Sequence, residues 1–147
     1  MQTFLPYADF RKSAAVLDRQ RLGKQRVEAW MLLQNLAGES KGWKNHPAVK
    51  MWRGHERSLI EYALAMCEEW VRRGYVDTRA PLIRAYRRKF PKSGPPPWLG
   101  KRAFHRSHQS NLVRKLPEHY RAYFPNVPDD LPYSWPAGVI GSPSPGR

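Results

Sequence analysis

The 147 residues of the chain suit one domain with one hydrophobic core, and a hydrophobic content of 41% excludes a wholly disordered protein. The 26 lysines and arginines outnumber the 12 acidic residues, and the formal net charge of +14 favours a polyanionic partner, with nucleic acid the first candidate. Because no apolar run is long enough to span a bilayer and no secretory signal is visible, we expect a cytoplasmic protein without a membrane partner.

The first part of the chain, over residues 9–36, predicts a short helix followed by a longer one. Asp9 and Asp18 are placed as the N-caps of these helices, and Gly38 is a stop signal after the second. The apolar side chains of the longer helix should face other helices. Three of its basic side chains are expected on the more polar faces: Arg19, Lys24 and Arg26.

The strongest helical pattern follows Pro47, a residue that suits the first turn of a helix. Apolar residues recur from there at helical spacing, which predicts one long helix over residues 47–73 with Gly74 at its C-terminal cap. A helix of that length would span the domain. The single cysteine, Cys67, falls in the apolar stripe, so we interpret it as core packing rather than as a reactive thiol.

Shorter elements are predicted beyond this helix. Thr78 can cap a helix that turns Leu82, Ile83 and Tyr86 inward and ends near the proline-rich loop at residues 91–97. A further helix is predicted over residues 100–115, with a turn or short helix after Pro117. The sequence therefore predicts an all-α, single-domain bundle of about four to five helices around one long central helix.

The end of the chain differs in composition from the rest. Proline, glycine, aspartate and serine become frequent after Pro125, although Tyr133 and Trp135 are candidates to dock on the body. We expect the domain to occupy residues 1–136 and a flexible, irregular tail to occupy residues 137–147.

The positive charge is concentrated in one stretch, because no acidic residue occurs between Asp77 and Glu118. If six basic residues of this stretch met phosphates, the log–log salt slope of binding would be about −5. Aromatic and histidine residues interleave with the charges, a mixture that suits phosphate contacts beside base stacking. The alternative is that the charges simply solvate helix faces. The basic residues are Arg79, Arg84, Arg87, Arg88, Lys89, Lys92, Lys101, Arg102, Arg106, Arg114 and Lys115.

The segment DRQRLGKQRVE, residues 18–28, carries a candidate for chemistry. Spacings of three and four residues place Arg21, Lys24 and Glu28 on one helical face. One interpretation is a surface ion-pair ladder worth a few tenths of a kcal/mol, roughly the value of such pairs on helices. The other is a general acid or electrostatic stabiliser beside a phosphate-binding site.

Histidines provide two further candidate sites. In GWKNHP, Asn45 and His46 stand immediately before the predicted long helix, where free backbone N–H groups bind anions, although helix capping alone would explain Asn45. In FHRSHQSNL, His105 and His108 are three residues apart, a spacing that could hold a metal ion. No third ligand accompanies them at a recognisable spacing, so we predict no metal site. Phosphate contact fits these histidines equally well.

The segments RLGKQRVE, GWKNHP and ALAMCEEWVRRGYVDT, in this order and spacing, resemble the pyrimidine-dimer DNA glycosylase or phage endonuclease V family. The resemblance covers roughly residues 1–78, and FHRSHQSNLVRKLPEHY is similar to a motif of bacterial relatives. It implies an all-helical domain without metal or organic cofactor. Such a domain flips a nucleotide out of lesion-containing double-stranded DNA and cuts the glycosidic bond. Pyrimidine dimers are the default lesion.

The resemblance also implies roles for individual residues. Family members attack the sugar C1′ with the N-terminal amine, form a Schiff base and can then break the strand by β-elimination. Gln2 has a bulky side chain that normally leaves the initiator methionine in place, so the nucleophile here would be the amine of Met1. At neutral pH a larger fraction of an α-amine than of a lysine is uncharged. Glu28 matches the essential glutamate, which acts on the sugar ring oxygen and the imine, and Arg21 stands where the phage enzyme has a histidine.

Twelve residues are predicted to bind the DNA, and we expect a monomer. Two alternatives stay open: a non-catalytic DNA- or RNA-binding protein on the same scaffold, and a histidine-dependent nuclease. The predicted DNA-binding residues are Arg21, Lys24, Arg26, Asn45, His46, Arg53, His105, Arg106, His108, Asn111, Arg114 and Lys115.

Overall fold

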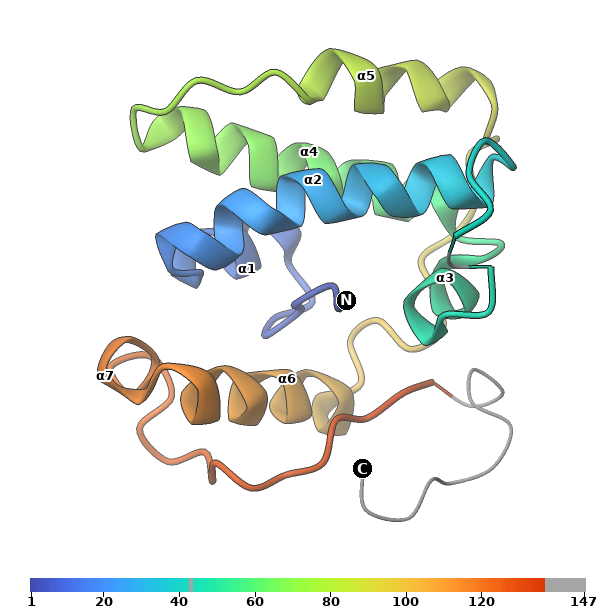
Figure 1. The fold of residues 1–147 in the computed structure, drawn as a ribbon. Coiled ribbons are helices and arrows are strands. Elements are labelled where there is room, and N and C mark those ends of the chain that lie inside the picture. Colours follow the sequence, from blue (N-terminus) through green and yellow to red (C-terminus); the bar gives the residue numbers. More distant parts are fainter. Residues whose placement is uncertain (43, 137–147) are drawn as a thin grey trace.

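The computed structural model describes residues 1–42 and 44–136, so the predicted tail at residues 137–147 lies outside the described residues. Within the described part the chain is all-helical and forms one compact body, which confirms the predicted fold class (Figure 1). The α-helices are α1 (Phe10–Val16), α2 (Arg19–Leu36), α3 (Pro47–Trp52), α4 (Glu56–Arg72), α5 (Ala80–Arg84), α6 (Arg102–Lys115) and α7 (Pro117–Tyr120). A 3-10 helix, η1 (Ala85–Arg88), continues α5.

Side-chain caps fix the starts of α1 and α2, as the sequence predicted. The Asp9 carboxylate accepts the Lys12 N–H at 3.0 Å, and the Asp18 carboxylate accepts the Arg21 N–H at 3.4 Å. Tyr120 of α7 donates its hydroxyl to the Asp18 carboxylate and accepts the Asp18 N–H at 2.9 Å. The start of α2 is therefore tied to α7.

The single long helix predicted over residues 47–73 is wrong, because the chain forms two helices there. α3 ends at Trp52 and α4 begins at Glu56, and Gly54 between them has a φ of +86°. The Gly54 N–H donates to Glu56 Oε2 at 3.0 Å. Two antiparallel helices, α2 and α4, therefore form the centre of the described part in place of one long helix (Figure 1).

The helix predicted after Thr78 exists, but its cap and one of its inward residues differ from the prediction. The Asp77 carboxylate, not Thr78, accepts the Ala80 N–H, at 2.9 Å. Ile83 and Tyr86 are buried as expected. Leu82 is 45% exposed, because residues three apart share one face of this short helix and Leu82 points away from it.

The core lies on both sides of the pair α2 and α4: toward α6 and α7, with the N-terminal segment running between, and toward α5 and η1, where Ile83 and Tyr86 are buried (Figure 1). Cys67 is buried in this core, where desolvation raises the pKa of its thiol to about 12, so its interpretation as core packing is confirmed. No helix of residues 1–42 and 44–136 is both long and apolar enough to cross a membrane.

Candidate functional site

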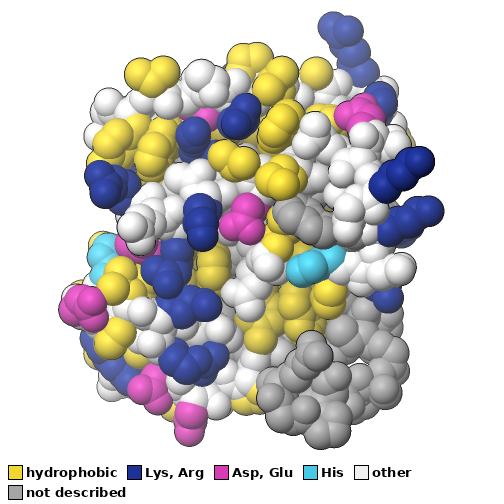
Figure 2. Space-filling view, in the orientation of Figure 1, with side chains coloured by type: hydrophobic (Ala, Val, Ile, Leu, Met, Phe, Trp, Pro, Cys, Tyr) yellow, Lys and Arg dark blue, Asp and Glu magenta, His cyan; other side chains and the backbone are white. Residues whose placement is uncertain are grey.

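A cleft of about 1170 Å³ opens where the N-terminus meets α2, α3 and the last described residues. Its lining includes Phe4, Gln25, Pro47, Tyr133 and Trp135. Figure 2 shows lysine and arginine side chains gathered over the start of α2 and over α6, beside an acidic side chain near the centre. The cleft brings together six of the fourteen residues predicted for the site: Met1, Arg21, Lys24, Glu28, His46 and Lys115.

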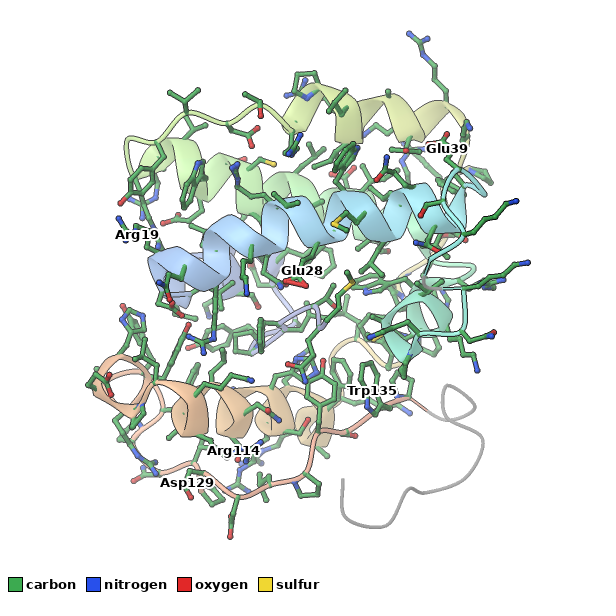
Figure 3. All side chains as sticks on the ribbon, in the orientation of Figure 1. Arg19, Glu28, Glu39, Arg114, Asp129 and Trp135 are labelled. Carbon is green, nitrogen blue, oxygen red and sulfur yellow. The ribbon has the colours of Figure 1, made fainter. Side chains whose placement is uncertain are left out.

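Glu28 is the half-buried carboxylate of this cleft, and it points from α2 toward the N-terminal segment (Figure 3). Burial raises the pKa of Glu28, and the N-terminal ammonium and the Lys24 ammonium partly offset that rise. Met1 and Glu28 thus line the same cleft, and their charges attract each other. The arrangement can hold a proton on a carboxyl beside an amine.

His46 lines the same cleft and is the N-cap of α3. Its Nδ1 accepts the Ala48 N–H at 3.0 Å, so His46, and not the exposed Asn45, is the capping side chain. Burial and the N-terminal ammonium lower the pKa of His46. A neutral imidazole is thus favoured beside the chain terminus.

Buried side chains of α2 and α4 hold the main chain of residues 2–4. Gln25 Nε2 donates to the Gln2 carbonyl at 2.8 Å, and Gln25 Oε1 accepts the Phe4 N–H at 3.0 Å. Tyr62 donates its hydroxyl to the Phe4 carbonyl at 2.8 Å and also contacts Gln25 Oε1. The N-terminal segment is therefore hydrogen-bonded along its length rather than loosely packed.

Helix α6 holds the next residue, Leu5, from the opposite side. The Leu5 N–H donates to His108 Nδ1 at 2.9 Å, and His105 Nδ1 donates to the Leu5 carbonyl at 2.7 Å while its Nε2 accepts the Gly100 N–H. His105 is 8% exposed and His108 is fully buried. Both imidazole rings are buried and hydrogen-bonded to the main chain of Leu5. This placement corrects the expectation that they contact phosphates.

Two other predicted DNA-binding side chains are also buried. Arg26 forms an ion pair with Asp77 at 3.3 Å and lies over the Trp70 ring, so it stabilises the contact of α2 with α4 and is not on a polar face. Asn111 is buried in α6 and donates to the Ser107 carbonyl at 3.4 Å. Both placements correct the expectation of contact with nucleic acid.

The remaining predicted residues are exposed but lie outside the cleft. Arg53 follows α3, and Arg106 lines a smaller hollow of about 510 Å³ together with Arg102. Arg114 donates to the Asp129 carbonyl at 2.7 Å, which ties the segment after α7 to α6 (Figure 3). The structure leaves these side chains open to solvent without joining them to the cleft.

Sequence reasoning missed the aromatic wall of the cleft and the amide that faces it. Tyr133 packs at a tilt against His108, with ring centroids 4.5 Å apart, and against Trp135 at 4.6 Å, so both predicted aromatic residues dock on the body and also line the cleft. Gln25 was missed as well. Its position three residues before Glu28 placed it near the same helical face, and that was the available signal.

The acid-free stretch does not form a single surface. α5 and η1 lie on the far side of α2 and α4 from α6 (Figure 1). Two cations on that side form ion pairs within the protein: Arg87 of η1 with Glu61, and Lys89, which follows η1, with Glu39, each at 2.7 Å. The cations that line the cleft come instead from α2 and the end of α6, and one of them, Arg21, also pairs with Asp18 at 3.1 Å.

Three comparisons bear on the identity of the chain. The comparisons with curated proteins and with solved structures both find no match. A family model described as pyrimidine dimer DNA glycosylase matches residues 1–81, which is more than half of the 147 residues. Within the described part, no cluster of three or more metal-ligating side chains accompanies the cleft. The matched region contains the N-terminal segment and Glu28, and the chain therefore belongs to the pyrimidine dimer DNA glycosylase family.

Proposed function

We propose that the chain is a DNA repair glycosylase that excises a damaged base, with the pyrimidine dimer as the default lesion, and that also cleaves the abasic site. The observation that carries the proposal is the shared cleft of Met1 and Glu28, in which the ammonium of the first residue influences the pKa of the carboxyl. Family membership supports the class of reaction.

In the proposed reaction the Met1 amine attacks C1′ of the flipped-out nucleotide. The N–C1′ bond forms and the glycosidic bond breaks, its electron pair leaving with the base, which takes up the proton that the amine loses. Opening of the sugar ring moves an electron pair onto the ring oxygen, and a proton from Glu28 neutralises that oxygen. The ionised Glu28 then stabilises the cationic imine. Loss of a C2′ proton would break the C3′–O bond and cut the strand.

The other side chains of the cleft suit a DNA strand. Arg21, Lys24 and Lys115 line the same cleft as the two reacting groups and can contact phosphates near the lesion. Tyr133 and Trp135 offer aromatic faces for an unstacked base. These contacts require a nucleotide that has left the helix, because the reacting groups sit inside the cleft.

Borohydride trapping on abasic duplex DNA tests the proposal, because only a Schiff base is reduced to a permanent crosslink. Intact-mass measurement first establishes that the Met1 amine is free. We expect a crosslink that disappears after acetylation of the N-terminus and falls by about a hundredfold or more in Glu28→Gln, the range typical of one removed electrostatic group.

Glu68→Gln is the matched control, since Glu68 is an exposed glutamate of α4 whose ion pair with Arg11 is solvent-exposed. This variant should trap as the parent protein does. Duplex binding without any crosslink in the parent protein would instead support a non-catalytic DNA-binding protein. A crosslink that survives N-terminal acetylation would assign the nucleophile to a lysine and overturn the role of Met1.

A further inference from the structure

The N-terminal segment is held in an unusual way for a chain terminus. Terminal residues usually fray unless they are tied down. Here side chains of three helices hydrogen-bond to the main chain of residues 2, 4, 5 and 6. We call these side chains the N-terminal clamp: Gln25, Tyr62, His105, His108 and Gln109.

The chemistry of the clamp indicates that position, and not only packing, is being fixed. Buried amide, phenol and imidazole groups need hydrogen-bond partners, and so do the main-chain groups of a segment that belongs to no helix. Each set satisfies the other here, and because hydrogen bonds are directional they fix the position of the segment as well as its packing. Gln25 and Tyr62 are both almost completely buried, and both form hydrogen bonds to the main chain of the first four residues. The clamp therefore holds the segment at a defined depth and register.

Gln25 occupies the decisive position in the clamp. It grips the Gln2 carbonyl, one residue from the terminal amine, and it lies three residues before Glu28 in α2. Side chains three apart in a helix are neighbours about 5–6 Å apart at Cβ. One helical turn thus carries both the carboxyl and the amide that anchors the residue next to the amine.

We infer that Gln25 is a positioning residue that sets the separation between the Met1 amine and Glu28, with Tyr62 orienting the Gln25 amide. This inference rests on the proposed function and names the part of the fold that holds the nucleophile. Gln25 is only 1% exposed, so we assign its role to its hydrogen bonds with residues 2 and 4 and not to contact with the substrate. Its contribution is to keep the amine within reach of C1′ while Glu28 faces the ring oxygen.

Gln25→Met tests the inference, because methionine has a similar volume and makes none of the three hydrogen bonds of the amide. We expect the single-turnover trapping rate on saturating abasic duplex to fall about tenfold to a hundredfold, the effect of misplacing a reacting group by about 1 Å. The dissociation constant of the duplex should not change, since the DNA-contacting cations are intact. The unfolding temperature of each variant is measured first, so that every assay is run well below the midpoint of thermal unfolding.

A series along the clamp separates positioning from loss of stability. Tyr62→Phe removes the hydroxyl that donates to the Phe4 carbonyl, and Gln109→Met removes the hydrogen bond to the Pro6 carbonyl at 2.8 Å. Positioning predicts that the trapping rate falls most for Gln25→Met, less for Tyr62→Phe and little for Gln109→Met. Should Gln25→Met not fold, Tyr62→Phe against Gln109→Met carries the same comparison.

The outcomes distinguish this inference from the proposed function. Absence of a crosslink in the parent protein rejects the proposed function itself. A parent protein that traps while Gln25→Met and Tyr62→Phe trap at the parent rate rejects the positioning role alone. Equal losses in all three variants, tracking their unfolding midpoints, would also overturn it, because a merely structural clamp acts through stability.

Discussion

The imidazole of His108 is fully buried between the main chain of Leu5 and the ring of Tyr133. Its Nδ1 accepts the Leu5 N–H, so its proton lies on Nε2 and the ring is neutral. Burial, and to a lesser extent His105, lowers the pKa of His108 to about 3. A second proton on the ring would make Nδ1 a donor, and it would then face the Leu5 N–H, which is also a donor.

This histidine couples the stability of the fold to pH. Because its pKa is lowered in the folded state and is about 6.5 when unfolded, the unfolded chain binds more protons between these values. Stability is therefore complete above about pH 6.5 and is lost as the pH falls toward 3. Between pH 7 and pH 4.5 the free energy of unfolding should drop by about 3 kcal/mol from this group, as measured by urea denaturation.

His108→Asn is the control for this pH dependence. Its amide oxygen can accept the Leu5 N–H in place of Nδ1, and the side chain does not titrate. The variant should lose distinctly less stability than the parent protein over the same pH range, although the acidic residues still contribute equally to both. Identical losses in the two proteins would show that His108 is not the titrating group.

At the residue scale, the sequence predicted which side chains of one helix lie together. It did not predict which side chains from distant parts of the chain meet in the fold. Arg21, Lys24 and Glu28 line one cleft, as helical spacing indicated. His105 and His108 were expected to face a ligand. Spacing cannot reveal that their partner is the main chain of Leu5, about a hundred residues away in sequence.

At the element scale the break between α3 and α4 shows what helical periodicity can and cannot predict. The apolar repeat continues from Val49 to Leu59 because both helices bury their apolar faces in the same core. The hydrophobic pattern therefore does not register the interruption. Only Gly54, in the left-handed conformation, marks it. The caps at Asp9 and Asp18 were predicted correctly because a cap depends on residues three positions apart.

Gly54→Ala should destabilise the protein. A side chain at a φ of +86° is strained although no atom lies within 4 Å of the added carbon, so the free energy of unfolding should fall by about 1 kcal/mol. Gly94→Ala is the matched control, since this glycine is equally uncrowded and its φ is not positive. Chemical denaturation of the two variants should show a loss only for Gly54→Ala, and equal stability would argue against the left-handed turn.

At the scale of the whole molecule, the sequence predicted the class of partner but not the surface that meets it. Residues 91–97 carry the chain from η1, on one side of α2 and α4, toward α6 on the other. A run without acidic residues is thereby divided between two sides. The sequence shows which charged residues are neighbours along the chain. Whether they share one surface depends on where the connecting segment at residues 91–97 places the helices on either side of it.

The dependence of DNA binding on salt distinguishes these two sides. Lys24 and Lys115 line the cleft, whereas Arg88 is exposed on η1, beyond α2 and α4. Each phosphate contact that is lost reduces the log–log salt slope by about 0.9, so Lys24→Ala and Lys115→Ala should each lower the magnitude of the slope by about 1. Titrations of lesion-containing duplex at several salt concentrations should give Arg88→Ala the slope of the parent protein. If Arg88→Ala flattened the slope and the two lysine variants did not, the DNA would have to lie across α5 and η1, away from Met1 and Glu28.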